Sequence, residues 1–210
     1  MNIVFRVDSY KEIGSGHLMR CLNLADELNE SNEIWFMTIA SDYSLELINR
    51  RGYKSLILDN FPKESKYKRI SINQDTHKSI AILTEIDIQV DILIVDNYFL
   101  DFRWEEKLRY ICKKIFVIDD LANRKHSCDM LLDQNLVNNM KSRYRHLVSN
   151  ETKLLLGPKY AILGKEYTLQ REKITFRSNQ IKKVLISFGG MDEFNLTGQL
   201  IEHLSSNKFK

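Results

Sequence analysis

A cluster of ionisable residues near the start of the chain is the clearest indication of chemistry in the sequence. Arg6 and Asp8 follow the apolar run 3–5, and His17 and Arg20 come shortly afterwards. Histidine is the only residue type among these four whose ordinary pKa lies near neutral pH, so His17 is the natural candidate for taking a proton from water. Four ionisable groups crowd the end of one predicted strand, the place where α/β proteins hold their ligands. The stretch 6–20 therefore predicts a ligand site.

Two glycines frame the turn inside this stretch. Gly14 and Gly16 flank Ser15, and apolar residues then recur with helical spacing from Leu18 to Leu28, which predicts a strand, a turn and a helix. Glycine lets a ligand approach the main chain closely, and the free N–H groups of a helix N-terminus suit a phosphate. The spacing matches neither the dinucleotide-binding pattern nor the P-loop. A purely steric role for these glycines is the alternative.

Acidic residues also end two later apolar runs. Asp96 and Tyr98 follow the run 91–95, and Asp119 follows the run 115–118. Right-handed crossovers bring the carboxyl ends of parallel strands to one edge, so we expect Asp8, Asp96 and Asp119 to face one cleft. Acids in this position also serve simply to cap the loop that follows, and the sequence leaves that alternative open.

Apolar runs typical of buried strands alternate with helical patterns over most of the chain. Strands are expected at 3–5, 33–38, 55–58, 91–95, 115–118, 130–132 and 153–156, and helices at 18–28, 45–51, 75–89, 104–111 and 140–147. This alternation predicts a doubly wound parallel α/β sheet. We assign residues 1–165 to one domain of this kind and residues 166–182, which are polar and weakly patterned, to a connector.

A second strand-turn-helix pattern follows the connector. The apolar run 184–188 leads to Gly189, Gly190 and Asp192, and then to a helical pattern that includes Leu196 and Leu200. From Lys183 about 28 residues are present, which are too few for a parallel sheet because each strand pair needs a crossover of a dozen or more residues. We therefore expect residues 183–210 to be the first β-α unit of a second, incomplete domain.

Composition excludes several classes of protein. The net charge of +3 gives no indication of nucleic-acid binding, and no apolar run approaches the roughly 20 residues that span a bilayer. The first residues do not resemble a signal peptide. The three cysteines have no metal-ligand spacing, so free or buried thiols in a reducing cytoplasm are expected. The sequence implies no metal and no cofactor.

Three stretches carry a resemblance to a known family. Residues 6–22, 120–136 and 155–163 resemble the UDP-sugar hydrolases of pseudaminic acid biosynthesis, and spore-coat polysaccharide proteins share the first stretch. These hydrolases remove UDP from UDP-2,4-diacetamido-2,4,6-trideoxy-β-L-altropyranose and have a GT-B-like fold. The resemblance implies a Rossmann-like N-terminal domain, a cytoplasmic enzyme of surface-glycan synthesis, and His17 as the catalytic base.

The resemblance also implies further roles. Water would attack the anomeric carbon with inversion, Asp8 would orient His17 or bind a sugar hydroxyl, and Tyr98 would bind the sugar. Arg6 and Arg20 would bind substrate or, as the residues themselves favour, hold the loop by pairing with acids such as Asp8. The full set of predicted substrate-binding residues is Arg6, Asp8, Gly14, Ser15, Gly16, Arg20, Asp96, Tyr98, Gly189, Gly190 and Asp192.

The chain departs from the family at two positions and leaves alternatives open. Asn97 stands where the family often has histidine, and Gly164 stands where it commonly has arginine. The alternatives to hydrolysis are a GT-B glycosyltransferase of surface polysaccharide synthesis and an inactive, truncated remnant. The sequence does not determine the oligomeric state, and a monomer is the expectation for a full-length form.

Overall fold

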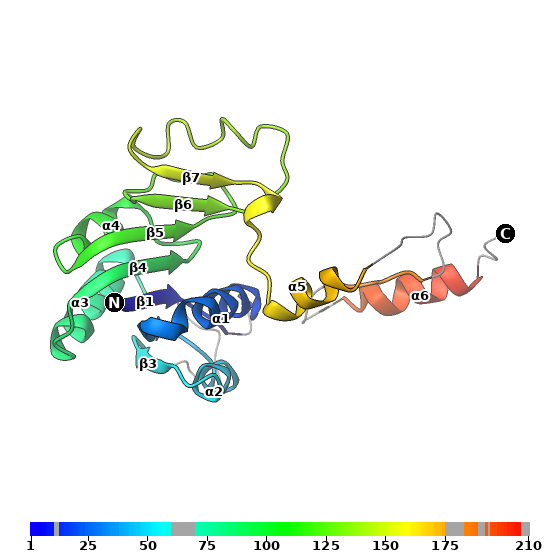
Figure 1. Ribbon diagram of the computed structural model, residues 1–210, viewed down its shortest axis with the longest axis horizontal. Coiled ribbons are helices and arrows are strands. Elements are labelled where there is room, and N and C mark those ends of the chain that lie inside the picture. The colour runs from blue at the N-terminus through cyan, green and yellow to red at the C-terminus, as the bar shows by residue number, and fades with distance from the viewer. Residues whose placement is uncertain (11–12, 60–69, 175–182, 189–191, 193, 207–210) are drawn as a thin grey trace. The chain divides into compact units, whose positions relative to one another are not determined.

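The computed structural model describes residues 1–10, 13–59, 70–174, 183–188, 192 and 194–206. The chain divides into two compact units, residues 1–165 and 166–210. The first unit is built on a sheet of seven parallel strands in the order β3-β2-β1-β4-β5-β6-β7 (Figure 1). The prediction of a doubly wound, Rossmann-like α/β sheet is therefore confirmed.

The strands of the first unit are short and mostly buried. They are β1 (Asn2–Val7), β2 (Glu33–Thr38), β3 (Lys54–Ile57), β4 (Val90–Asp96), β5 (Cys112–Ile118), β6 (Met130–Asp133) and β7 (Lys153–Leu156). The helices are α1 (Gly16–Leu28), α2 (Asp42–Arg50), α3 (Ile72–Glu85) and α4 (Phe102–Leu108), with short 3-10 turns η1 (Asn29–Ser31) and η2 (Pro158–Tyr160). Helix α5 (Lys165–Glu172) begins at the end of this unit.

Side chains of alternate residues in the strands form two hydrophobic cores, one on each face of the sheet. On one face, Ile3 and Phe5 of β1 pack with Leu18 and Leu22 of α1. On the other face, Val4 belongs to a core that includes Trp104 of α4 and Leu83 of α3. This alternation is what a parallel sheet covered by helices on both faces requires.

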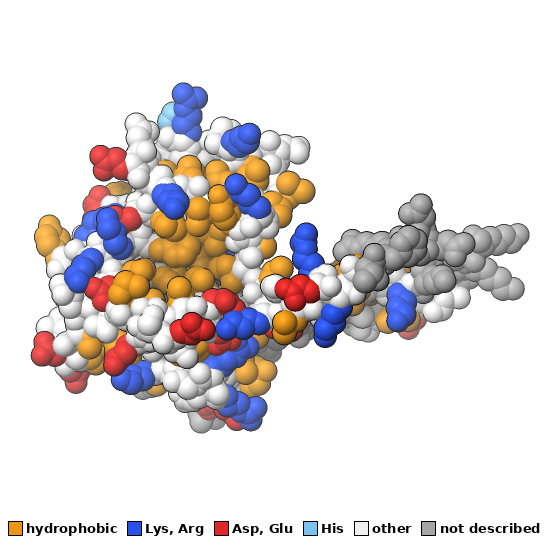
Figure 2. Space-filling view, viewed as in Figure 1, with side chains coloured by type: hydrophobic (Ala, Val, Ile, Leu, Met, Phe, Trp, Pro, Cys, Tyr) orange, Lys and Arg blue, Asp and Glu red, His pale blue; other side chains and the backbone are white. Residues whose placement is uncertain are grey.

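The carboxyl-terminal half of the sheet is connected differently. Residues 119–129 join β5 to β6 as a loop, and residues 134–152 join β6 to β7 as a loop with consecutive turns, so the β-α alternation stops at β5. Figure 2 shows apolar side chains gathered over the β4–β7 part of the α1 face. Partly buried apolar residues of this face include Ile92, Phe116 and Leu155. None of the described helices within residues 1–165 begins in these two connections.

The helix predicted at 140–147 is wrong. Residues 138–147 form overlapping turns, in which most main-chain bonds join residues three apart, such as Leu147 N to Tyr144 O. Arg143 and Tyr144 are held by contacts with buried acids: Arg143 lies against Asp133, and the Tyr144 hydroxyl donates to Asp119. The helical spacing of apolar residues was present, but these side-chain contacts fix the segment in another conformation.

Helix α3 begins earlier than the pattern indicated. The prediction placed its start at Asp75, whereas Ser71 is the N-cap and Ile72 the first helical residue. The Ser71 Oγ accepts from the Gln74 N–H at 3.3 Å, and the Gln74 Oε1 accepts from the Ser71 N–H at 2.9 Å. This is a complete capping box, and it moves Asp75 into the first turn of the helix.

The second unit contains α6 (Leu196–Ser206), as the helical spacing predicted. Residues 184–188, predicted as a strand, have no regular secondary structure. A strand is defined by hydrogen bonds to a partner strand, and within the described part of this unit no strand is present to pair with it. Among the helices that the structure describes, none has the length and apolar character needed to cross a membrane.

The two serine caps of this fold predict different effects on stability. We expect Ser71→Ala to lower the free energy of unfolding by about 1 kcal/mol, because it removes the hydroxyl of the α3 capping box. Ser15 is the N-cap of α1 but makes no side-chain capping bond, so Ser15→Ala is the matched control and should change stability by less than about 0.5 kcal/mol. Urea denaturation measures both, and equal losses would contradict the assignment.

Candidate active site

The site lies where the order of the strands reverses. Strands β1 and β4 are neighbours in the sheet although 82 residues separate the end of β1 from the start of β4 in the chain, and Val7 is in register with Asp96. Loops diverge to the two sides of such a position and leave a crevice at the carboxyl ends of the strands. Helix α1 starts from this point, so the first turn of α1 places His17 beside the end of β4.

His17 is paired with Asp96. The distance from His17 Nδ1 to Asp96 Oδ1 is 2.6 Å, and the side chains are 11% and 1% exposed. In this arrangement Nδ1–H donates to the carboxylate, which leaves the lone pair of a neutral imidazole on Nε2. Among the residues that the structure describes, none forms a hydrogen bond with this Nε2. A histidine held in this way can accept a proton from a molecule in the adjoining space.

Arg20, one turn further along α1, binds the same carboxylate. Its Nε lies 2.6 Å from Asp96 Oδ2 and its Nη2 lies 2.6 Å from Asp96 Oδ1. The Nη2 atom is also 3.1 Å from His17 Nδ1, but a guanidinium can only donate. Nδ1 of His17 is itself a donor here, because its N–H forms the hydrogen bond to Asp96. Two donors cannot bond to each other, so the contact between Arg20 and His17 is a close approach and not a hydrogen bond.

These cations determine the charge of Asp96. Burial alone would raise the pKa of this carboxyl, but the hydrogen bonds and charges of Arg20 and His17 outweigh burial and lower it below its ordinary value. The same contacts raise the pKa of Arg20, although burial works in the opposite direction. Asp96 is therefore ionised at neutral pH and can stabilise an imidazolium at His17.

A small cavity adjoins the histidine. Its lining residues come from the turn after β1, the first turn of α1 and the end of β4, and they are Asp8, Ile13, His17, Asp96, Asn97, Tyr98 and Phe99. The Tyr98 ring meets the His17 ring edge-on at 4.4 Å, and its hydroxyl donates to Asp120 at 3.2 Å. Burial, followed by the charge of Asp120, raises the pKa of Tyr98 to about 12, so this hydroxyl keeps its proton.

Asp8 does not orient His17. Among the described contacts, its carboxylate accepts from Arg6, from the Ile39 N–H at 2.8 Å and from Asn97 Nδ2 at 2.7 Å. The resemblance implied that Asp8 could orient His17, but the carboxylate that contacts His17 is that of Asp96. The register of β1 and β4 places Asp96 next to the first turn of α1. Asp8 still lines the cavity, so a contact between Asp8 and a sugar hydroxyl remains a prediction.

Arg6 is a buried structural cation. Its side chain is 1% exposed and binds Asp8 and Asp75, with Nη2 at 2.6 Å from Asp75 Oδ2. The Asp75 carboxylate also accepts from the Trp104 indole N–H at 2.7 Å. This agrees with the interpretation that Arg6 pairs with acids, and it ties β1 to α3 and α4. A role of Arg6 in substrate binding stays a prediction.

The turn before α1 leaves space around its main chain. Gly14 has a φ of +79°, which favours glycine, and a Cβ added at Gly14 or Gly16 would meet no atom within 4 Å. Ser15 makes no side-chain bond to the first turn of α1, and that turn contains no acidic residue. These features agree with the interpretation that a ligand approaches here, and contacts from Gly14, Ser15 and Gly16 to substrate stay a prediction.

The predicted residues of the second unit are only partly described. Gly189 and Gly190 lie outside the described residues. Asp192 accepts from the Leu196 N–H at 2.8 Å and the Thr197 N–H at 3.0 Å, so its carboxylate caps α6. These hydrogen bonds lower the pKa of Asp192. A contact between Asp192 and substrate remains a prediction.

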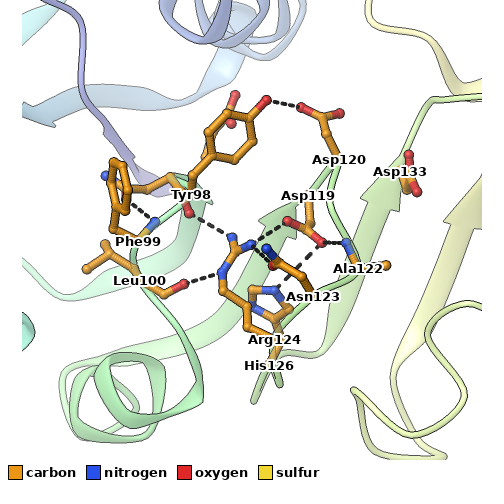
Figure 3. Close-up of polar contacts among 12 residues, drawn as sticks. Tyr98, Phe99, Leu100, Asp119, Asp120, Ala122, Asn123, Arg124, His126 and Asp133 are labelled. Carbon is orange, nitrogen blue, oxygen red and sulfur yellow. Dashed lines mark hydrogen bonds and ion pairs between the residues drawn. The ribbon is translucent and has the colours of Figure 1, made fainter. Parts of the chain in front are cut away.

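Asp119 does not line the cavity of His17, contrary to the expectation that all three strand-end acids face one cleft. It lies at the same edge of the sheet but is fully buried, and it accepts from the Ala122 N–H and from Arg124 (Figure 3). It also accepts from the Tyr144 hydroxyl. This is the capping alternative that the sequence left open. Asp8 and Asp96 line the cavity and Asp119 supports the loop beside it.

Sequence reasoning missed several partners in this region. Asp120 binds both Arg20 and the Tyr98 hydroxyl, Asp75 binds Arg6, and Arg124 binds Asp119. Asp120 could have been found, because it directly follows the strand-end acid Asp119. No sequence pattern near Asp75 or Arg124 indicates their roles. Asp75 contacts Arg6, and Arg124 contacts the carbonyls of Asn97 and Leu100, all of which are distant in the chain.

Comparison with known proteins gives two curated relatives. The chain is 30% identical over 212 aligned residues to the uncharacterized protein MJ1062 of Methanocaldococcus jannaschii, covering 98% of this chain and 40% of that protein. It is 28% identical over 211 aligned residues to the UDP-2,4-diacetamido-2,4,6-trideoxy-beta-L-altropyranose hydrolase of Campylobacter jejuni, covering 99% of this chain and 67% of that protein. The chain is therefore a distant relative of a UDP-sugar hydrolase.

Two further comparisons are less informative. No family model matches the chain. Among solved structures, MurG of Acinetobacter baumannii superposes with a TM-score of 0.45 and 8% identity, over 65% of this chain and 41% of that one.

Removal of Arg6 should be costly to the fold. We expect Arg6→Met to lower the free energy of unfolding by about 3–5 kcal/mol, because two buried carboxylates lose their cation. Arg50→Met is the control, since Arg50 is 73% exposed and pairs with Glu46 within α2; its effect should be below about 0.5 kcal/mol. Urea denaturation at neutral pH measures both, and similar effects of the two variants would show that Arg6 is not a structural ion.

The lowered pKa of Asp96 predicts a dependence of stability on pH. A carboxyl whose pKa is lower in the folded state adds stability above its unfolded pKa of about 3.9, and this stability is lost as the pH falls. We expect Asp96→Asn to be less stable than the wild type at pH 7, with a smaller difference at pH 3. Glu46→Gln, in an exposed pair, should change little at either pH. Denaturation at both pH values tests this, and a constant difference for Asp96→Asn would contradict it.

Proposed function

We propose that the protein hydrolyses a UDP-activated diacetamido-trideoxy hexose to free sugar and UDP, in the synthesis of a nonulosonic acid for surface glycans. The observation that carries the proposal is the pair of His17 and Asp96, with 2.6 Å between Nδ1 and Oδ1, beside a cavity at the reversal of strand order. The distant relationship to a hydrolase of this substrate supports it. The same distant relationship is the basis for expecting a cytoplasmic enzyme.

His17 would serve as the general base. Its neutral imidazole takes the proton of a water molecule at Nε2, while that water attacks the anomeric carbon. The imidazolium that forms is stabilised by Asp96, which is ionised and fixed by Arg20. The anomeric C–O bond breaks on the opposite side, so the configuration inverts in one displacement.

The departing diphosphate needs donors that are already in place. The first turn of α1 offers N–H groups that the side chain of its N-cap residue, Ser15, does not cap, and such groups favour an anion. The family resemblance implies that Gly189 and Gly190 also contact the phosphates. Asp8, Asn97 and Tyr98 line the cavity with groups that hydrogen-bond hydroxyls and amides, which suits the sugar ring.

Release of free sugar without an acceptor is the decisive test. The protein is incubated with UDP-2,4-diacetamido-2,4,6-trideoxy-β-L-altropyranose, and free sugar and UDP are measured together. Because the chain spans 67% of the Campylobacter hydrolase, the assay uses both this chain and a form joined to a complete second domain, which should be much the more active. UDP release that requires an added acceptor would instead identify a glycosyltransferase, and no release from either form would support a remnant.

Substitution of the base should separate turnover from binding. In the longer form, we expect His17→Asn to reduce kcat by about 10²–10⁴-fold, because a general base typically contributes this much. UDP affinity, measured by calorimetry, should stay within a few fold, since the substitution leaves the main-chain N–H groups proposed to hold the diphosphate unchanged. His146→Asn, at an exposed histidine, is the control and should keep the wild-type rate. Near-normal hydrolysis by His17→Asn would show that another group is the base.

A further inference from the structure

Arg124 joins two neighbouring loops at the carboxyl edge of the sheet. Its Nε donates to the Leu100 carbonyl and its Nη2 donates to the Asn97 carbonyl, each at 2.8 Å. Its Nη1 donates to Asp119 Oδ1, also at 2.8 Å. Figure 3 shows the guanidinium lying between the segment after β4 and the segment after β5. The side chain is only 13% exposed, so water hardly competes for these bonds.

The segment that Arg124 holds is the one that lines the cavity. Asn97, Tyr98 and Phe99 all line the space beside His17, and the two carbonyls that accept from Arg124 lie at the first of these residues and directly after the last. With both ends of the segment fixed, the Tyr98 ring is held against the edge of the His17 imidazole. Arg124 itself is not among the residues of this cavity.

The other end of the bridge is firmly anchored. Asp119 is fully buried and also accepts from the Ala122 N–H at 2.8 Å and the Tyr144 hydroxyl at 2.9 Å. Burial alone would raise the pKa of Asp119, but the charge of Arg124 and these hydrogen bonds lower it. The carboxylate therefore stays charged, and the guanidinium has a fixed partner at the end of β5.

We propose that Arg124 is a positioning residue that sets segment 97–100 against His17 by bridging its main chain to Asp119. The inference rests on the proposed function only for its kinetic consequence. Three N–H bonds leave one planar guanidinium in different directions, which a lysine ammonium cannot reproduce at these three acceptors. Small displacements of reacting groups can reduce rates by about 10²-fold, so the loss should appear in kcat while KM changes little.

The test uses two substitutions of Arg124 and one matched control. Arg124→Lys keeps a cation beside Asp119, so it preserves the buried charge pair but not the two carbonyl bonds. Arg124→Ala removes these three bonds and the Nη1 bond to Asn123 Oδ1 at 3.2 Å, and it leaves space for added guanidinium ion. The control is Arg109→Ala, because Arg109 also joins a carbonyl, that of Ser127, to a carboxylate, that of Asp129. Its partners precede β6, at the opposite end of the strands from His17.

Kinetics and amide exchange are measured on the same preparations. We expect Arg124→Lys and Arg124→Ala to lower kcat at least 10-fold with KM within about three-fold, and Arg109→Ala to keep the wild-type kcat. Guanidinium chloride, compared with equal sodium chloride, should restore part of the kcat of Arg124→Ala. Hydrogen–deuterium exchange should be faster in a peptide covering residues 97–100 in both Arg124 variants and unchanged there in Arg109→Ala.

Each other outcome decides against the proposal. Wild-type kcat in Arg124→Lys, an increase in KM alone, or an equal loss in Arg109→Ala would overturn it. If Arg124→Ala does not fold, Arg124→Lys alone decides. If the wild-type protein releases no UDP from any UDP-sugar tested, the proposed function fails. The exchange measurement then still decides whether Arg124 fixes segment 97–100, and unchanged exchange in both Arg124 variants would contradict the inference.

Discussion

A carboxylate that is withdrawn from water must be fully paired, and Asp96 meets this requirement at the end of β4. Its side chain is 1% exposed and receives hydrogen bonds from His17 and Arg20, both on the first two turns of α1. The pairing joins the helix to a strand that begins 62 positions after the helix ends. Since an unpaired buried charge is so costly, α1 cannot move away from β4 without loss of stability. The position of the imidazole is thus fixed by the same interaction that ties α1 to β4.

Buried carboxylates near the ends of the neighbouring strands are paired in the same way. After β1, Asp8 and Asp75 share Arg6, and after β5, Asp119 is held by Arg124. Each pair uses a guanidinium, which donates in several directions at once, to connect elements that are distant in sequence. The result is a row of paired charges along the carboxyl edge of the sheet, already in place without a ligand. Preorganised charges of this kind need no rearrangement when charge develops in a reaction.

Most of the fold could be predicted from local patterns. The apolar runs and helical spacings indicated the parallel sheet, and the acids at 8, 96 and 119 were placed correctly at one edge, because strand direction follows from the alternation of elements. Side-chain partners could not be predicted. Asp8 is closer to His17 in the sequence than Asp96 is, yet the register of β1 and β4 brings Asp96 to the histidine. The helix expected at 140–147 was wrong for a related reason, since tertiary contacts of Tyr144 with buried acids override its helical spacing.

The thiol of Cys21 lies directly behind this arrangement. It is fully buried, and its Sγ is 3.5 Å from Asp96 Oδ2. Burial, and then the charge of Asp96, raises the pKa of Cys21 well above its ordinary value, which leaves the sulfur protonated and unreactive while α1 rests on β4. An alkylating reagent can reach this sulfur only when the contact between the helix and the strand opens. The rate of Cys21 alkylation therefore measures how often the contact between α1 and β4 opens. Mass spectrometry can follow this rate without any substrate.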